Sequence, residues 1–144
     1  MPRPEAALLD PARYPFTTRT TTRFADVDPN RHLNNVALAA MMEDARVRFN
    51  VGLGLREAIQ PNRPMVASFG IEYLSQGYFP DPVEVHVAVA ETGRSSVTMI
   101  QLLTQNGRAV AFARSVIVCT DGERSAPLPE GFAARAIASW GLRG

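Results

Sequence analysis

Lysine is absent from this 144-residue sequence, because all 15 basic residues are arginine. Without a side-chain amine the chain cannot form a Schiff base, anchor pyridoxal phosphate or supply the lysine of a phosphate-binding loop. Cysteine and histidine are nearly as scarce, with Cys119, His32 and His86 as the whole supply. They exclude an intrachain disulfide and are too few for a Cys/His zinc cluster. These absences predict a cytoplasmic protein that uses neither a metal nor a redox cofactor.

Strong charge of one sign and long apolar runs are missing as well. The net charge is +1, from 15 basic and 14 acidic residues, so nucleic acid is not an expected partner. No stretch approaches the roughly 20 apolar residues of a membrane span, and the first residues lack the apolar run of a signal peptide. What is present, 46% hydrophobic and 20% charged residues in 144, predicts one soluble globular domain without a membrane partner.

The first half of the chain contains one predicted helix. Four prolines in residues 1–15 predict a loosely ordered lead-in, followed by a single domain over residues 16–144. The threonine-rich run 16–24 favours a β-strand. Residues 36–49 repeat apolar side chains at spacings of three and four, which predicts a helix. Its first half is apolar all round, as in a helix enclosed by a sheet.

The second half of the chain reads as strands. Alternating or β-branched runs predict strands over residues 65–74, 83–93, 96–105 and 108–120, and a short terminal helix is predicted over 132–140. The pair Asn106-Gly107 predicts a tight hairpin between the last two strands. One helix followed by four strands indicates an α+β fold with a largely antiparallel sheet.

Polar side chains are densest in the loop before the predicted helix, namely Asp26, Asp28, Asn30, His32, Asn34 and Asn35. Such residues serve as turn and cap residues, but loops held on a rigid scaffold also carry catalytic groups. A calcium loop is excluded, because Arg31 and Ala37 stand where the EF-hand needs glycine and glutamate. A G-x-S-x-G elbow and a phosphate-binding glycine loop are also missing.

The run Arg23-Phe-Ala-Asp-Val-Asp-Pro-Asn-Arg-His-Leu-Asn-Asn35, with Met42-Glu-Asp-Ala-Arg46 after it, resembles a family signature. It is similar to D-x-D-x-x-G-H-x-N-N followed by E-x-A-R in the hotdog-fold acyl-CoA thioesterases, 4-hydroxybenzoyl-CoA thioesterase-like branch. The resemblance covers roughly residues 17–125. It implies an antiparallel sheet wrapped around one long central helix, in a homodimer or homotetramer with its site between two chains. Arg31 replaces the usual glycine, so we expect Asn30 to take any left-handed conformation the turn needs.

The resemblance implies that Asp28 is the catalytic carboxylate, acting as nucleophile or as general base for water. Backbone amides around Leu33 to Asn35 would stabilise the oxyanion at the helix N-terminus. His32 either orients Asp28 or contacts substrate, or it is a turn residue. Asn34 and Asn35 are expected to cap and shape the helix start.

Substrate contacts are expected at two further places. Coenzyme A phosphates would meet the turn that holds Arg94, Ser95 and Ser96. An apolar acyl pocket would draw on Leu33, Met41, Met42, Phe69, Tyr73 and Tyr78, which are otherwise core residues. Glu43 is a rival carboxylate, although Arg46 three residues later offers a plain ion pair.

The resulting prediction is an acyl-CoA thioesterase in which coenzyme A enters only as part of the substrate. Two alternatives stay open. One is a non-catalytic hotdog protein that binds acyl-CoA or another apolar ligand, because fold does not fix function. The other is a hotdog dehydratase or hydratase, which would need His32 to act with Glu43.

Overall fold

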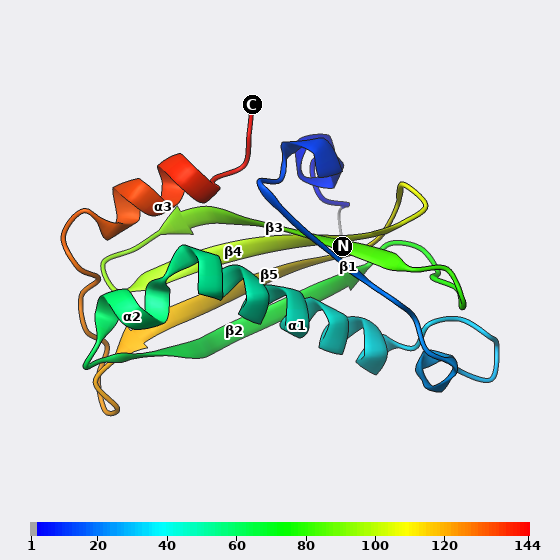
Figure 1. The fold of residues 1–144 in the computed structure, drawn as a ribbon, viewed down its shortest axis with the longest axis horizontal. Helices are drawn as coiled ribbons and strands as arrows, with labels where there is room; N and C mark the ends of the chain where they lie inside the picture. The colour runs from blue at the N-terminus through cyan, green and yellow to red at the C-terminus, as the bar shows by residue number, and fades with distance from the viewer. Residues whose placement is uncertain (1–2) are drawn as a thin grey trace.

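The computed structural model describes residues 3–144, and its centre is one five-stranded antiparallel sheet with the order β1-β3-β4-β5-β2 (Figure 1). The strands are β1 (Phe16–Thr20), β2 (Arg63–Tyr73), β3 (Val83–Thr92), β4 (Ser96–Gln105) and β5 (Arg108–Thr120). Their bounds match the sequence patterns within two residues, except that β1 stops four residues early. After β1 the chain enters a 3₁₀ turn, η3 (Phe24–Asp26).

The long helix α1 (Asn35–Leu53) lies along the inner face of this sheet. It begins after Asn34, whose side chain accepts a hydrogen bond from the Ala37 N–H at 2.7 Å. It ends at Gly54, which takes the left-handed conformation with φ 72°. A short helix that the sequence patterns did not predict, α2 (Leu55–Ile59), follows at once.

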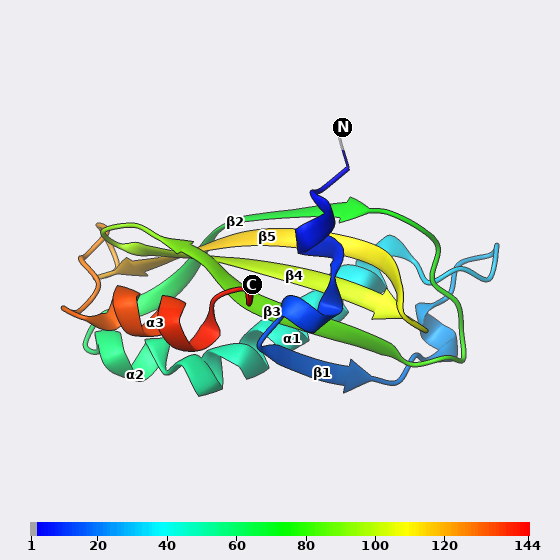
Figure 2. The same cartoon turned by 90° about the horizontal axis from the view of Figure 1, so that it is seen from above.

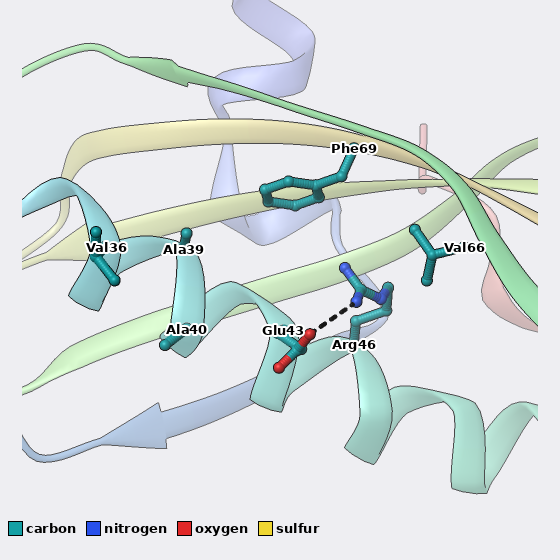
Figure 3. A pocket seen from close by; sticks show the side chains of 7 residues that line it. All are labelled: Val36, Ala39, Ala40, Glu43, Arg46, Val66 and Phe69. Carbon is teal, nitrogen blue, oxygen red and sulfur yellow. Dashed lines mark ion pairs between the residues drawn. The ribbon is translucent and has the colours of Figure 1, made fainter.

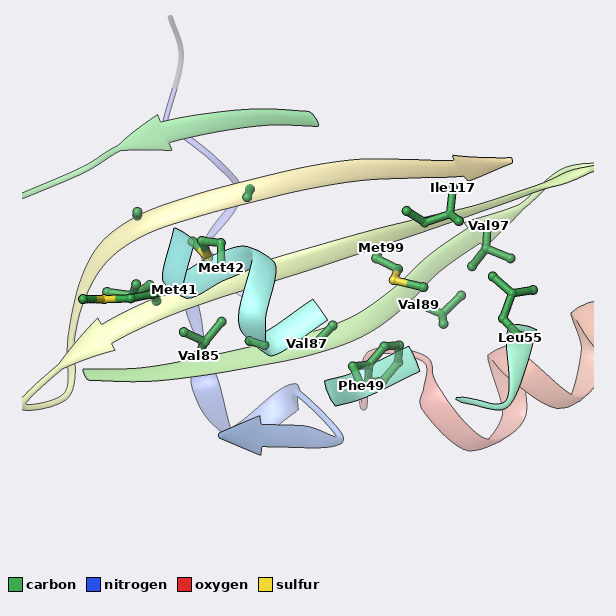
Figure 4. Close-up of a cluster of buried hydrophobic side chains, with 14 of the residues drawn as sticks. Met41, Met42, Phe49, Leu55, Val85, Val87, Val89, Val97, Met99 and Ile117 are labelled. Atoms are coloured by element: carbon green, nitrogen blue, oxygen red, sulfur yellow. The ribbon is translucent and has the colours of Figure 1, made fainter. Parts of the chain in front are cut away.

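Apolar side chains between α1 and the sheet form the main core (Figure 4). Met42 and Phe49 of α1 are fully buried against valines of β3 and against Met99 of β4. The C-terminal helix α3 (Phe132–Trp140) closes one end of this core, where Trp140 packs edge-on against Phe49 at 5.4 Å between ring centroids. The predicted fold, an antiparallel sheet curled around one long helix, is confirmed.

The side of α1 that faces away from the sheet is not covered by other described residues of this chain. Val36 is 80% exposed, and Val47 and Val51 are exposed on the same helix. One sheet can cover only one side of a helix, and β2 ends the sheet beside this open side. Apolar side chains on α1 and β2 therefore border a common exposed surface.

Residues 3–15 are more ordered than their prolines suggest, while residues 1 and 2 lie outside the described part. Two short 3₁₀ helices, η1 (Ala6–Leu9) and η2 (Pro11–Arg13), cross the sheet on the face opposite α1 (Figure 2). They cover a second cluster in which Tyr14 is buried against Ile100, Leu102 and Phe112. The prolines prevent a long helix but are compatible with these single turns.

Candidate active site

The loop between η3 and α1 is held by a buried carboxylate. Asp26 accepts hydrogen bonds from the backbone N–H and the guanidinium of Arg23, both at 2.9 Å. Burial alone would raise the pKa of Asp26, but the hydrogen bonds and charge of Arg23 hold that pKa below its usual value. The Asp26 carbonyl also accepts the Asn34 N–H at 2.8 Å. Asp26 therefore fixes the loop and does not face a substrate.

Asp28, the predicted catalytic residue, is held by one oxygen and free at the other. Its Oδ1 accepts the backbone N–H groups of Asn30 at 2.8 Å and His32 at 3.1 Å. Within residues 3–144, Oδ2 has no hydrogen-bond partner, and the residue is half-buried. A carboxylate positioned in this way can accept a proton or attack an electrophile without rearranging the loop.

Arg31 itself takes the left-handed conformation, with φ 66°, at the position where the family signature has glycine. The expectation that Asn30 would do so is wrong. The Arg31 N–H donates to the Asp28 carbonyl at 2.9 Å, so the loop keeps its tight turn despite the side chain. A non-glycine residue pays a conformational cost for this backbone geometry.

The amide donors at the helix start differ in part from those predicted. The Leu33 N–H donates to the Gly77 carbonyl and the Asn34 N–H to the Asp26 carbonyl, each at 2.8 Å. Across the described part of the chain, the first-turn N–H groups of Asn35 and Val36 have no acceptor. The residues Asn35 and Val36 line a shallow hollow of about 530 Å³ together with Asp28 and Asn34.

Two predicted tyrosines also reach this end of the molecule. The Tyr73 hydroxyl, at the end of β2, donates to the Asn35 carbonyl at 3.2 Å. Tyr78 forms a β-bridge with His32, and their rings meet edge to face at 5.4 Å between centroids. The structure thus brings Asp28, His32, Asn34, Asn35, Tyr73 and Tyr78 together.

A larger hollow of about 790 Å³ adjoins Asp28 on its other side. Sequence reasoning missed its apolar walls, which include Phe24, Val27 and Phe79, and its cation, Arg31. Phe24 and Phe79 are both exposed and lie 6.1 Å apart between centroids in an edge-to-face pair. An aromatic residue directly before the Asp-rich loop was the available signal, because a loop buries few such side chains.

A narrower hollow of about 380 Å³ runs between α1 and β2 (Figure 3). It shares Val36 with the hollow beside Asp28, and its other lining residues are Ala39, Ala40, Glu43, Arg46, Val66 and Phe69. Phe69 was expected to contact the acyl group and does lie here. Glu43, the rival carboxylate, has a 69% exposed side chain at the rim and pairs with Arg46 at 3.7 Å.

Other predicted contact residues lie elsewhere in the single chain. Met41 and Met42 are buried in the main core and line none of the three hollows near Asp28. The turn Arg94 to Ser96 precedes β4, whereas Gln105 at the other end of β4 binds the Tyr78 backbone. A ten-residue strand separates these ends by about 30 Å, so the turn is remote from Asp28 of the same chain.

Neither a metal cluster nor a membrane helix is found in residues 3–144. No three side chains of the types that bind metals gather in one place. No helix combines the length and apolar character that a membrane crossing requires. The candidate site is therefore described by its carboxylate, its amides and its apolar walls.

Comparison with known proteins places this chain in a family. Residues 22–136 match the Thioesterase-like superfamily, so the chain belongs to that superfamily. The match spans the Asp28 loop, α1 and the whole sheet apart from β1.

Two solved structures and one bacterial protein are similar to this chain. A Thermus thermophilus thioesterase complexed with coenzyme A and Zn has 36% identity, with 88% of this chain and 95% of that chain covered and a TM-score of 0.76. A predicted thioesterase from Bacillus stearothermophilus has 25% identity, covers 90% and 98% of the two chains and gives a TM-score of 0.74. The uncharacterized protein YsmA of Bacillus subtilis is 26% identical over 86 residues, which span 60% of this chain and 58% of YsmA.

Proposed function

We propose that this protein is an acyl-CoA thioesterase in which Asp28 acts on the thioester carbonyl. The observation that carries the proposal is that Asp28, Asn35 and Val36 line one hollow, where the Oδ2 of Asp28 and the amides of Asn35 and Val36 have no partner among residues 3–144. Membership of the Thioesterase-like superfamily and the similarity to a thioesterase bound to coenzyme A support thioester chemistry.

The reaction divides between the carboxylate and the helix. Either Asp28 attacks the carbonyl carbon, or it takes a proton from a water molecule that does so. Negative charge then develops on the carbonyl oxygen, where the Asn35 and Val36 N–H groups and the helix dipole stabilise it. The C–S bond then breaks and the thiolate leaves and is protonated to coenzyme A, by Asp28 where that residue took the proton of the water. Where Asp28 attacked, the acyl–Asp28 anhydride is hydrolysed by water, which restores the carboxylate. In both routes water supplies the second oxygen of the product acid.

The hollows suggest how the two parts of the substrate lie. Coenzyme A is the larger part and carries phosphates, so we assign it to the wide hollow with Phe24, Phe79 and Arg31. The acyl group then enters the narrow apolar hollow that begins at Val36 and continues along α1. Arg94 to Ser96 would reach a bound coenzyme A only from a second copy of the chain.

We further propose a cytoplasmic homodimer or homotetramer. β2 is an edge strand of the sheet, and its exposed side chains include Met65, Val66 and Phe69. Exposed edges with apolar side chains are normally covered by another chain. Light scattering at micromolar concentration tests this, and a monomeric mass contradicts it.

A second candidate function is acyl-CoA binding without hydrolysis. It is favoured by Oδ1 of Asp28, which already holds the loop as an ordinary turn residue does. In that case wild-type protein binds acyl-CoA tightly but releases no thiol. An Asp28 variant that bound acyl-CoA as tightly as the wild type would then show that the Asp28 carboxylate has no role in binding or catalysis.

The decisive experiment measures free thiol released from a panel of acyl-CoA thioesters. Asp28→Asn keeps an oxygen for the loop hydrogen bonds but removes the reactive carboxylate, so kcat should fall at least about 100-fold. Asp44→Asn is the control, because Asp44 is an exposed helix residue paired with Arg48. Near wild-type hydrolysis by Asp28→Asn would overturn the proposed role.

A further inference from the structure

The Arg46 guanidinium is a largely buried cation that makes no hydrogen bond with residues 3–144. Its side chain is only 7% exposed and none of its five N–H donors is paired there, yet its nitrogens are not among the fully enclosed unpartnered atoms, so they open onto the adjoining space. Among residues 3–144 the one carboxylate within 4 Å is Glu43, whose Oε2 lies 3.7 Å away and whose side chain is 69% exposed. A solvent-facing carboxylate at that distance compensates a buried guanidinium poorly.

The guanidinium points into the narrow hollow between α1 and β2 (Figure 3). The Phe69 ring lies over it, with 5.6 Å from the guanidinium carbon to the ring centroid. Ala39, Ala40 and Val66 complete apolar walls that offer no acceptor of their own. A ligand that enters this hollow therefore meets hydrocarbon along the way and one strong donor group at its end.

The hollow that holds Arg46 adjoins the proposed reaction centre through one shared lining residue. Val36 lines both this hollow and the one beside Asp28. The Arg46 side chain leans back toward Glu43, eight residues after the Asn35 amide, which corresponds to about 12 Å along the helix. An extended carbon chain advances about 1.2 Å per bond, and a hydrogen bond of about 3 Å at each end covers part of the distance, so roughly six to ten carbons bridge the remainder.

We propose that Arg46 binds a carboxylate at the far end of the acyl group, and that the substrates are CoA thioesters of dicarboxylic acids of about six to ten carbons. This inference rests on the proposed thioesterase activity, because it places the thioester carbonyl at Asn35. A carboxylate matches the planar fork of a guanidinium and satisfies two donors at once. A methyl-terminated chain fills the same space but leaves Arg46 without an acceptor.

The kinetic test uses two thioesters that differ only at the chain end, suberoyl-CoA and octanoyl-CoA. Wild-type protein should prefer suberoyl-CoA by about tenfold or more in kcat/KM. Arg46→Met should abolish or invert that ratio, and Arg46→Lys should retain part of it. Arg48→Met is the matched control, because Arg48 is an exposed arginine of the same helix paired with Asp44, and its ratio should equal the wild-type ratio.

Glu43→Gln provides a test of opposite sign. Removing this carboxylate leaves Arg46 with no anionic neighbour, so the preference for suberoyl-CoA should rise. If Arg46 variants do not fold, the proposal is still tested by the ratio of kcat/KM for suberoyl-CoA to that for octanoyl-CoA, measured in the wild type and in Glu43→Gln. Equal hydrolysis of both thioesters by wild type, with no rise in Glu43→Gln, would overturn the proposal while leaving the thioesterase function intact.

A binding measurement separates the inference from catalysis altogether. Calorimetry with free suberate and octanoate should show tighter binding of suberate to the wild type, and loss of that difference in Arg46→Met. Failure of all thioester hydrolysis would count against the proposed function, and equal binding of the two acids would count against Arg46. If Arg46→Met changes the oligomeric mass but not the ratio of the two acids, the missing acceptor comes from a second copy and the proposal is wrong.

Discussion

Asp28 and His32 are joined by a pair of hydrogen bonds that use only the backbone of His32. The Asp28 N–H donates to the His32 carbonyl at 2.9 Å, and the His32 N–H donates to Oδ1 of Asp28 at 3.1 Å. The imidazole meanwhile packs against the Tyr78 ring. The histidine thus positions the carboxylate by folding the loop, and its ring takes no part in that contact.

Replacement of the His32 ring should therefore have little effect on turnover. His32→Phe keeps the backbone hydrogen bonds and the edge-to-face contact with Tyr78, so we expect kcat to change less than about tenfold. A ring that carried a proton in the reaction would cost about 100-fold or more when removed. Steady-state hydrolysis at pH 7 distinguishes the two, and a 100-fold loss would show that the ring acts directly.

Arg31→Gly should stabilise the protein while weakening substrate binding. Glycine adopts a φ of 66° without the steric strain that arginine has in this conformation. Arg31→Gly should therefore raise the free energy of unfolding by about 1 kcal/mol. Loss of the guanidinium from the wide hollow should raise KM for acyl-CoA. Arg31→Ala is the control, since it loses the charge but keeps the strain. In denaturant unfolding, only Arg31→Gly should show a higher free energy of unfolding than the wild type.

Gly77→Ala should disturb the start of α1. A Cβ at Gly77 would lie 2.8 Å from Cδ1 of Leu33, whose N–H is bound to the Gly77 carbonyl. Leu33 is buried in the core, so its side chain must repack or the loop must shift, and kcat should fall about 10- to 100-fold. Gly70→Ala is a matched control on β2, because no atom lies within 4 Å of its added Cβ. Equal activity in both variants would contradict this.

We expect the burial of His86 to make the fold less stable in mild acid than at neutral pH. Its ring is buried between the hydroxyls of Thr17 and Thr104, at 2.8 Å and 3.0 Å, and burial lowers its pKa although Glu84 opposes the shift. The unfolded chain then binds more protons below about pH 6.5, so stability falls as the pH drops through and below that value.

Thermal melting between pH 7.5 and 5 measures this dependence. His86→Gln can keep hydrogen bonds to both threonines but cannot be protonated, so its melting temperature should fall less steeply with acid. Identical slopes for wild type and variant would assign the acid sensitivity to other groups.

The central helix and most strands could be predicted because local chemistry determines them. Asn34 caps α1 through its side chain, Gly54 ends it with a positive φ, and Asn106-Gly107 makes the last hairpin. The strand β3 alternates between two clusters, with Val87 facing α1 and Ala88 facing the other side. In each case a few neighbouring residues carry the whole signal.

The site was predicted less completely because it depends on contacts between distant segments. The Leu33 N–H donates to the Gly77 carbonyl and the Asn34 N–H donates to the Asp26 carbonyl. No local sequence pattern predicts these acceptors. In the sequence, Arg46 resembles one half of a surface ion pair. In the structure, β2 places the ring of Phe69 over its guanidinium. The N-terminal turns likewise depend on an apolar sheet face that residues far along the chain supply.

The free edge of β2 has a practical consequence. Ten of its eleven residues pair with β5 on one side, and no described strand pairs with the other side, so the backbone groups of that side can accept an added strand. A synthetic peptide with the sequence Arg-Pro-Met-Val-Ala-Ser-Phe-Gly-Ile-Glu-Tyr would offer that edge a copy of itself. Such a peptide would compete with the proposed homodimer contact, and it would inhibit a dimer-dependent activity without entering the hollow beside Asp28.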